Sequence, residues 1–221
     1  MNNLNHVAFI MDGNGRWGLK KKRGRNYGHL KGVETVKKVV TCAIKLKIPI
    51  VTFYVFSSEN WKRPKTEISF LFKLIKQYFS QEIENVLSQG IKIKIFGDEK
   101  KLPLDLKKIL KKIIKLTKKN KKITVNLAIN YGSKQEILSA AKKTKNLNFK
   151  NFKKNLYTQD MPDPDILIRT GGHRRLSNFM LWQLAYSELF FLDKLWPDFS
   201  QKDLKNILKS FRKRKRNFGA I

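Results

Sequence analysis

One segment sets the expectations for this chain: His6-Val7-Ala8-Phe9-Ile10-Met11-Asp12-Gly13-Asn14-Gly15-Arg16-Trp17. Its apolar first half predicts a buried strand that ends at Asp12. The following Gly-Asn-Gly turn leads toward a helix, and the backbone N–H groups of such a turn can hold a phosphate. Asp12 is placed to hold Mg²⁺, and Arg16 to hold phosphoryl oxygens. The residues alone leave two interpretations open, a diphosphate site or a tight strand–helix turn with a capping aspartate.

Short apolar runs alternate with longer segments of helical period along the rest of the chain. Strands are predicted over 7–11, 50–56, 91–96, 124–128 and 166–169, and helices over 32–47, 67–87, 104–119, 134–143 and 201–216. This alternation predicts a single α/β domain over 1–221, with a mostly parallel central sheet flanked by helices. Ligands bind at the carboxyl ends of strands in such sheets. The polar motifs follow the first, second and fifth predicted strands, so they fall at that edge.

Composition bounds the partners and the compartment. The chain has 48 Lys and Arg against 17 Asp and Glu, a formal charge of +31, which favours anionic partners unless the lysines only solvate helix faces such as 107–122. Cys42 is the only cysteine, which excludes a disulfide within the chain and fits a reducing cytoplasm. We expect no signal peptide. The longest apolar run, near 48–56, is about half of the ~20 residues that a membrane-spanning helix needs.

Three further motifs could carry chemistry. Arg25 and His29 are four apart, so on a helix they would share a face, although a basic surface turn is an alternative. The loop after the second strand holds hydroxyl, carboxylate, amide, indole and guanidinium groups, at Ser57, Ser58, Glu59, Asn60, Trp61 and Arg63. The loop after the fifth strand combines two glycines with fork-shaped donors that could surround a second diphosphate, from Arg169 through Arg174 and Arg175 to Ser177.

Glu188 is a lone acid in an apolar run, where it is either a second carboxylate for Mg²⁺ or half of a structural salt bridge. Two signatures are absent from the sequence. It has no Asp-Asp-x-x-Asp metal motif, and Pro162 and Pro164 keep the acids around them off a common helix face. It also lacks the Gly-x-x-x-x-Gly-Lys-Ser/Thr phosphate loop of ordinary nucleotide hydrolases.

Taken together, these motifs resemble the cis-prenyltransferases, specifically the bacterial undecaprenyl diphosphate synthases. The resemblance covers nearly the whole chain, with 6–17, 25–29, 56–64, 130–132, 169–178, 181–189 and 195–199 in the family's order and spacing. It implies a Mg²⁺-dependent enzyme, usually a homodimer, that extends farnesyl diphosphate with isopentenyl diphosphate units in cis. The implied product is undecaprenyl diphosphate, the lipid carrier precursor for peptidoglycan. Nucleic acid is not an expected partner.

The resemblance also implies roles for matching residues. Asp12 would be the catalytic acid that works with Mg²⁺, and Glu188 a second metal ligand, supplied in one arrangement to the partner subunit's site. Asn60 would take or relay the proton lost from isopentenyl diphosphate, unless the departing diphosphate does so. The allylic diphosphate would be bound by Gly13, Asn14, Gly15, Arg16, Arg25 and His29, with Trp17 beside it. Ser57, Ser58, Glu59, Trp61 and Arg63 would close over the substrates, and Arg169, Arg175, Leu176 and Ser177 would hold isopentenyl diphosphate.

A hydrophobic tunnel for the growing chain has its own rationale in the sequence. The helix predicted over 67–87 carries more apolar surface than one solvent-facing helix needs, at Ile68, Leu71, Phe72, Leu74, Ile75 and Phe79. Each buried methylene contributes about 0.8 kcal/mol, so tunnel depth should set product length. Plain core packing is the alternative for any one of these side chains.

Some features depart from the family pattern or exceed its needs. His173 and Arg174 follow the double glycine, where the family usually has Glu at the first position. The basic C-terminal tail, 212–221, predicts peripheral contact with anionic lipid at the inner face of the plasma membrane. Three other functions stay open: a cis-prenyltransferase of different product length, a non-catalytic subunit of a heteromeric enzyme, and a basic RNA-binding protein.

Overall fold

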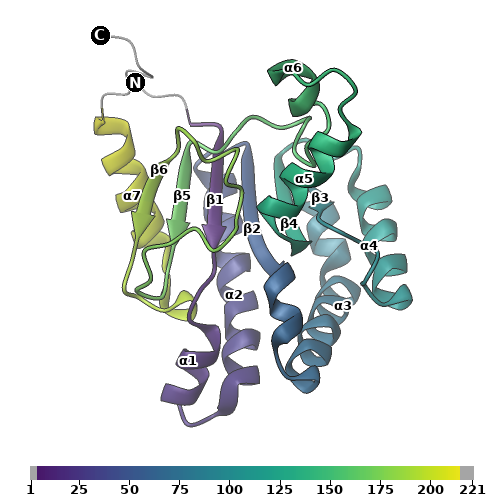
Figure 1. Cartoon of the computed structure of the whole chain (residues 1–221). Helices are drawn as coiled ribbons and strands as arrows, with labels where there is room; N and C mark the ends of the chain where they lie inside the picture. Colours follow the sequence, from purple (N-terminus) through teal and green to yellow (C-terminus); the bar gives the residue numbers. More distant parts are fainter. Residues whose placement is uncertain (1–3, 215–221) are drawn as a thin grey trace.

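The computed structural model describes residues 4–214 (Figure 1). One six-stranded sheet runs in the order β3-β4-β2-β1-β5-β6, and every neighbouring pair of strands is parallel. The strands are β1 His6–Ile10, β2 Ile50–Ser57, β3 Ile91–Phe96, β4 Ile123–Tyr131, β5 Ile166–Arg169 and β6 Glu188–Phe191. The predicted α/β architecture with a parallel sheet is confirmed.

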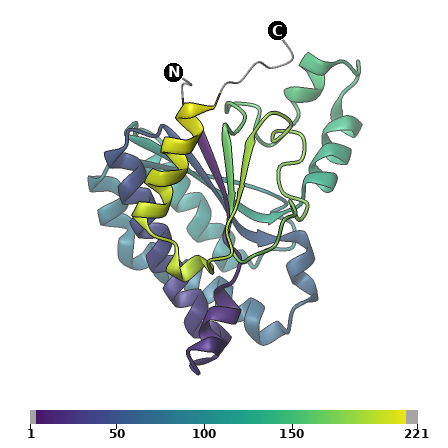
Figure 2. The same ribbon diagram turned by 90° about the vertical axis from the view of Figure 1, so that its left-hand side faces the viewer.

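Helices cover both faces of the sheet (Figure 2). One layer packs against the larger apolar core and contains α2 Gly24–Lys45, α3 Lys65–Ser88, α4 Leu104–Thr117 and α7 Gln201–Lys213. The opposite face carries α5 Ser133–Lys143 and α6 Phe149–Lys153. The short α1, Asn14–Lys20, projects beyond the carboxyl ends of the strands, and the 3-10 turns η1 Ser58–Lys62 and η2 Trp196–Asp198 complete the fold.

The central strand β1 is buried at all five positions, as a strand with both faces covered should be. Phe9 points into the larger core, where it stacks on Phe53 at 5.1 Å and meets the edge of Trp196 at 5.9 Å between ring centroids. Ala8 belongs to the second core on the other face, together with Phe179 and Met180. Residues of β1 therefore join both cores and hold the sheet between them.

The connections place a crevice beside β1. The chain leaves β1 for β2 on one side and returns, after β4, to β5 on the other side of β1. The loops that follow β1, β2 and β5 therefore meet at the carboxyl edge of the sheet, which is the usual ligand position in such folds. In Figure 1 this edge faces α1.

Several boundaries differ from the predicted ones. The helix expected over 32–47 begins at Gly24, so it includes both Arg25 and His29. The sequence did not predict the short strand β6, which begins at Glu188 and pairs with β5. Helix α7 ends at Lys213, and most of the predicted basic tail, 215–221, lies outside the described residues. Within residues 4–214, no helix combines the length and the apolar character needed to cross a bilayer.

Candidate active site

A polar cleft lies at the carboxyl edge of the sheet, between the loops that follow β1, β2 and β5. It gathers most of the residues singled out in the sequence. Its lining includes Asp12, Gly13, Asn14, Gly15, Arg16, Arg25, His29, Ser57, Glu59, Asn60, Arg63, Arg169, Arg175 and Ser177. Motifs far apart in sequence therefore form one wall, as their positions after parallel strands predict.

Two arginines hold the carboxylate of Asp12. Arg16 Nη2 donates to Asp12 Oδ1 at 3.1 Å, and Arg169 Nη2 donates to Oδ2 at 2.9 Å. Arg169 is the last residue of β5, where it pairs with Ile10 of β1, and its side chain is only 4% exposed. Asp12 keeps 27% of its side chain exposed to the cleft. The site thus has an accessible carboxylate with a fixed orientation.

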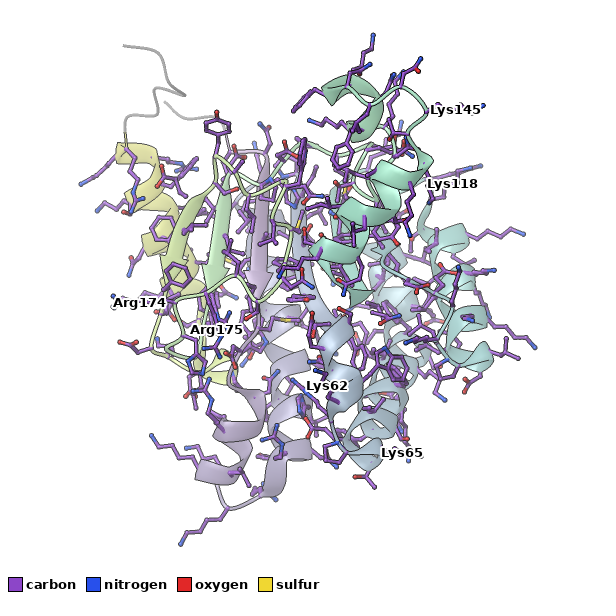
Figure 3. The ribbon with its side chains drawn as sticks, viewed as in Figure 1. Lys62, Lys65, Lys118, Lys145, Arg174 and Arg175 are labelled. Atoms are coloured by element: carbon purple, nitrogen blue, oxygen red, sulfur yellow. The ribbon has the colours of Figure 1, made fainter. Side chains whose placement is uncertain are left out.

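The loop after β5 is shaped around these contacts. Arg16 Nη2 also donates to the carbonyl of Gly171 at 2.8 Å. Gly171 has φ of +90°, and a Cβ there would lie 2.6 Å from Arg16 Nη2, so the backbone can approach the ion pair only as glycine. Arg169 Nη1 donates to Ser177 Oγ at 2.7 Å and to the carbonyl of Arg175. Figure 3 shows Arg174 and Arg175 on this loop, at the edge of the sheet nearest α1.

A second carboxylate, Glu67 in the first turn of α3, organises the other side of the cleft. Arg25 Nε donates to Glu67 Oε2 at 3.0 Å, Arg63 Nη1 donates to Oε1 at 3.0 Å, and His29 Nε2 lies 3.3 Å from Oε1. Burial would raise the pKa of Glu67, but hydrogen bonding and the charges of the two arginines outweigh it and lower that pKa. Burial is also the main cause that lowers the pKa of His29. At neutral pH the cluster therefore pairs an ionised Glu67 with a neutral histidine.

The loop after β2 begins with a capping box. Asn60 Oδ1 accepts a hydrogen bond from the backbone N–H of Ser57 at 3.1 Å, which fixes the amide. Glu59 accepts from Asn178 Nδ2 at 2.8 Å. Burial would raise the pKa of Glu59, but its hydrogen bonds, that from Asn178 first, outweigh this and lower the pKa. Glu59 is therefore an ionised group on the cleft wall.

An apolar cavity adjoins the cleft, between the sheet and helices α2 and α3. The cleft and the cavity share five lining residues, which mark the junction: Met11, Asn14, His29, Val55 and Leu71. Asn14 Oδ1 is buried there without a hydrogen-bond partner. Beyond the junction the cavity continues past Ile75 and Phe79 to Val86 of α3 and Ile91 of β3. A ligand with a charged head and a long hydrocarbon tail would match this arrangement, with the head in the polar cleft and the tail in the apolar cavity.

Known proteins are similar to this chain in both sequence and fold. A family model described as "Putative undecaprenyl diphosphate synthase" matches residues 10–219. The chain belongs to this family of prenyltransferases. Among its relatives are isoprenyl transferases of Rickettsia bellii, 45% identical over 99% of both chains, and of Fusobacterium nucleatum, 42% identical over 98% of this chain and 96% of that protein.

Two solved structures from the same family superpose over almost all of the chain. One is lavandulyl diphosphate synthase from Lavandula x intermedia in complex with dimethylallyl diphosphate, with a TM-score of 0.93 and 33% identity over 97% of this chain and 98% of that one. The other is a probable undecaprenyl diphosphate synthase from Campylobacter jejuni, with a TM-score of 0.85 and 35% identity over 99% and 100%. The shared fold places the cleft within a prenyltransferase scaffold.

Some of the residues proposed from the family resemblance lie outside the cleft lining. Trp17 stacks on Tyr27, and its Nε1 donates to Asp198 Oδ1 at 2.7 Å. Trp61 donates to Asn130 Oδ1 at 2.7 Å and packs on the larger core. Ser58 Oγ is buried without a partner, and Leu176 packs against the second core. Their substrate-binding roles stay predictions.

Glu188 is not brought to Asp12 within one chain. It is the first residue of β6 and pairs in register with Ile166, whereas Asp12 follows the far end of β1 beyond Arg169. Along the strand direction, Glu188 lies beside Ile166, three residues or about 10 Å before Arg169. Glu188 forms an ion pair with Arg214 instead. Within one chain, the position of Glu188 therefore favours the salt-bridge interpretation. A metal role for Glu188 requires a partner subunit.

The residues present fit a magnesium ion that is completed by substrate. Among residues 4–214, no group of three or more His, Cys, Asp or Glu side chains could hold a metal. Mg²⁺ commonly binds through one or two carboxylates together with substrate phosphates. Asp12 keeps lone pairs beyond the two that its arginines use, and it opens to the cleft. Its setting matches that mode.

Sequence reasoning missed two residues of the site, Glu67 and Asn178. Glu67 lies in the first turn of α3, where acidic residues are common, so the sequence alone does not single it out. Its position four residues after Arg63 was the available signal. Asn178 stood at the end of a motif but carried no expected role, and its partners Glu59 and Lys134 are distant in sequence.

Proposed function

We propose that this prenyltransferase extends farnesyl diphosphate with successive isopentenyl diphosphate units, each added in cis, to give undecaprenyl diphosphate for peptidoglycan and other cell-wall glycans. The observation that carries the proposal is the junction of an arginine-lined cleft with an apolar cavity. The diphosphate would lie against Arg16 and Arg25, and the prenyl chain would enter the cavity past Leu71. Burial of each added methylene contributes about 0.8 kcal/mol.

The charges of the cleft suit the first step of the reaction. Breaking the allylic carbon–oxygen bond leaves negative charge on the departing diphosphate, and fixed cationic donors stabilise it. Arg16 is held by Asp12 and Gly171, and Arg25 by Glu67, so neither has to reorganise as charge develops. A donor of this kind typically contributes about 3–4 kcal/mol to the rate.

The second substrate would lie against Arg169, Arg175 and Ser177, so that its double bond faces the allylic carbon. A new carbon–carbon bond forms, and the resulting cation loses a proton to give the new double bond. We propose the departing diphosphate as the proton acceptor. The oxygen of Asn60 already accepts from the backbone of Ser57 and a neutral amide is a weak base, so Asn60 would orient rather than accept.

Mg²⁺ would be held by Asp12, together with diphosphate oxygens and, in a homodimer, Glu188 of the partner subunit. When bound, it would neutralise diphosphate charge as a Lewis acid. A homodimer is part of the proposal, because β6 is an edge strand whose exposed Leu189 could meet a second copy. The molar mass in solution tests it, and a monomer at working concentration would contradict it.

The deciding experiment is a product assay with a matched variant. The purified protein is incubated with farnesyl diphosphate, labelled isopentenyl diphosphate and Mg²⁺, beside Asp12→Ala, and products are resolved by chain length. We expect a Mg²⁺-dependent ladder that ends near C55 and is lost in the variant. A folded wild-type protein that makes no product would reject the enzyme and favour a partner-dependent subunit or an RNA-binding protein.

A different chain length is the second candidate, favoured by one comparison. The structural relative with a TM-score of 0.93 is a lavandulyl diphosphate synthase that was solved in complex with dimethylallyl diphosphate. Offering dimethylallyl and farnesyl diphosphates in competition separates the two functions. The apolar lining, which runs along α3 from Leu71 to Val86, favours the longer substrate.

Contact with anionic membranes is a further part of the proposal. A shallow surface groove beside α7 is lined by Leu46, Lys205, Leu208, Lys209, Arg212 and Lys213. Lysine and arginine near an anionic surface contribute about 1 kcal/mol each. We expect salt-sensitive co-sedimentation with anionic vesicles. Binding that is unchanged after removal of 212–221 would contradict a role for the tail.

A further inference from the structure

The cleft wall contains a strained segment just after the predicted isopentenyl diphosphate loop. Ser177, Asn178 and Met180 have φ of 50°, 61° and 47°, a left-handed conformation that residues with a Cβ rarely adopt. Strain of this kind persists only where the surroundings fix it, and it gathers at functional sites. Phe179 and Met180 are fully buried in the second core, so the segment is anchored on one side of Asn178.

Asn178 caps helix α5 from outside that helix. The N-cap residue Gly132 has no side chain to accept the first N–H groups. The backbone carbonyl of Asn178 accepts from Ser133 N at 2.8 Å, and Asn178 Oδ1 accepts from Lys134 N at 2.8 Å. Both acceptors come from a loop more than forty residues away, and together they satisfy two N–H groups that a helix start leaves open.

The capping contacts determine which way the amide points. Because its oxygen must face the N–H of Lys134, its nitrogen turns toward the cleft wall. Asn178 Nδ2 donates to Glu59 Oε1 at 2.8 Å and to Gln135 Oε1 at 3.0 Å. Glu59 lies one residue before Asn60, and Asn178 directly follows Ser177, which Arg169 holds at 2.7 Å. One side chain therefore joins the loops that follow β2 and β5 to the first turn of α5.

We propose that Asn178 is a positioning residue that ties the loop of Glu59 and Asn60 to the isopentenyl diphosphate loop, so that the two substrates are aligned for condensation. This rests on the proposed function, since it needs two substrates in one cleft. The loops come from strands on opposite sides of β1, and the hydrogen bond between Asn178 and Glu59 links them directly. The rate of a reaction between two bound substrates depends steeply on their alignment. A misplacement of one ångström lowers it on the order of 100-fold.

The test separates positioning from capping by three substitutions of Asn178. Asn178→Asp keeps an oxygen for Lys134 N but places a second carboxylate against Glu59. Asn178→Gly keeps the left-handed backbone and removes all side-chain bonds. Asn178→Ala removes the bonds and strains the backbone. Asn155→Ala is the matched control, because Asn155 is equally half-buried and its amide bonds Thr144 and Asn151 in the α5–α6 region.

We expect kcat to fall about 10- to 100-fold in both Asn178→Asp and Asn178→Gly. The KM for isopentenyl diphosphate should rise, while the KM for the allylic diphosphate changes little, because Asn178 does not contact Arg16 or Arg25. Asn155→Ala should keep wild-type kinetics. A purely structural cap predicts instead that Asn178→Asp restores activity. Wild-type kcat in either Asn178→Asp or Asn178→Gly would overturn the inference.

A double-mutant cycle with Glu59→Ala gives an independent readout. If the two side chains act through each other, the double variant with Asn178→Ala should be about as slow as the slower single variant. If the fold reductions in kcat of the two single variants multiply in the double variant, the two side chains are not coupled. Because all variants are compared with an active wild-type enzyme, a wild type without product would reject the proposed function itself, whereas an active wild type with unaffected variants would reject only this inference.

Discussion

Individual carboxylates in this site hold cations in place rather than acting alone. Asp12 fixes Arg16 and Arg169, and Glu67 fixes Arg25 and Arg63. A guanidinium that is already oriented loses less freedom when it meets a diphosphate. The two acids therefore lower the entropy cost of binding a diphosphate, even though they reduce the net positive charge of the cleft.

Glu67→Gln tests this argument directly. The amide carries no charge and has one accepting oxygen in place of the two that Arg25 and Arg63 use, so the KM for the allylic diphosphate should rise about 10-fold or more. Glu82→Gln is the control, because Glu82 pairs with Lys37 across the same two helices but away from the cleft. Tighter substrate binding by Glu67→Gln would instead mean that the carboxylate competes with the diphosphate.

His6 should make stability depend on pH. Its Nδ1 faces the carbonyl of Pro162 at 2.8 Å and its Nε2 the hydroxyl of Thr52 at 2.6 Å, which favours the neutral ring with hydrogen on Nδ1. Burial lowers its pKa from 6.5 to about 4. Since the unfolded chain takes the proton first, stability is complete above pH 6.5 and falls toward pH 4, by about 3 kcal/mol from this group.

Chemical denaturation at several pH values checks this. His29, whose pKa is also lowered, adds to the same trend, whereas the lowered pKa values of Glu67 and Asp203 act only below about pH 4.5. His6→Gln should therefore flatten the curve between pH 6.5 and 4.5. An unchanged slope in that variant would show that His6 is not the source.

Among the elements, α1 and α2 pack unusually closely, and this brings the Gly-Asn-Gly turn to the cleft. A Cβ at Gly28 would lie 1.8 Å from the backbone oxygen of Asn14, and one at Gly18 would lie 2.1 Å from the oxygen of Gly24. Backbone atoms cannot yield as flexible side chains do. The two helices therefore depend on glycine at their contact.

Gly28→Ala should destabilise the protein by about 3 kcal/mol, because α1 has to move away from α2. Gly24→Ala is the control: Gly24 has φ of +74°, but a Cβ added there would meet no atom within 4 Å, so only backbone strain of about 1 kcal/mol is expected. Thermal unfolding measures both, at about 2–4 °C per kcal/mol for a chain of this size. Equal shifts in the two variants would contradict the packing argument.

The sequence predicts some of the strands but not the contacts between distant elements. Strands with a clear period were found, and β3 and β5 agree with their predicted bounds. Strand β6 was missed because its pairing with β5, rather than its own pattern, makes it a strand. The contacts of Arg25 with Glu67 and of Asn178 with Glu59 span 42 and 119 residues, and no local periodicity encodes such pairs.

At the scale of the whole molecule, the sheet and two helices enclose a cavity whose length can be tested. Along α3 its lining runs from Leu71 at the junction to Val86, fifteen residues or about 22 Å of helix. Of the side chains predicted to form a tunnel, Leu71, Leu74, Ile75 and Phe79 line it, whereas Ile68 and Phe72 pack in the core. The cavity therefore has a near end at the cleft and a far end between α3 and β3.

Substitutions at two depths should shorten the product by different amounts. Val36 of α2 lies closer to the junction than Val86, and both line the cavity. We expect Val36→Trp to stop the chain after fewer additions than Val86→Trp, because the indole fills space that the growing chain would occupy. Chromatography of labelled products measures the two distributions, and initial rates with the first isopentenyl unit control for damage to the cleft. If both variants made the wild-type product at wild-type length, the chain would have to leave the cleft by another route, and the cavity would lose its assigned role.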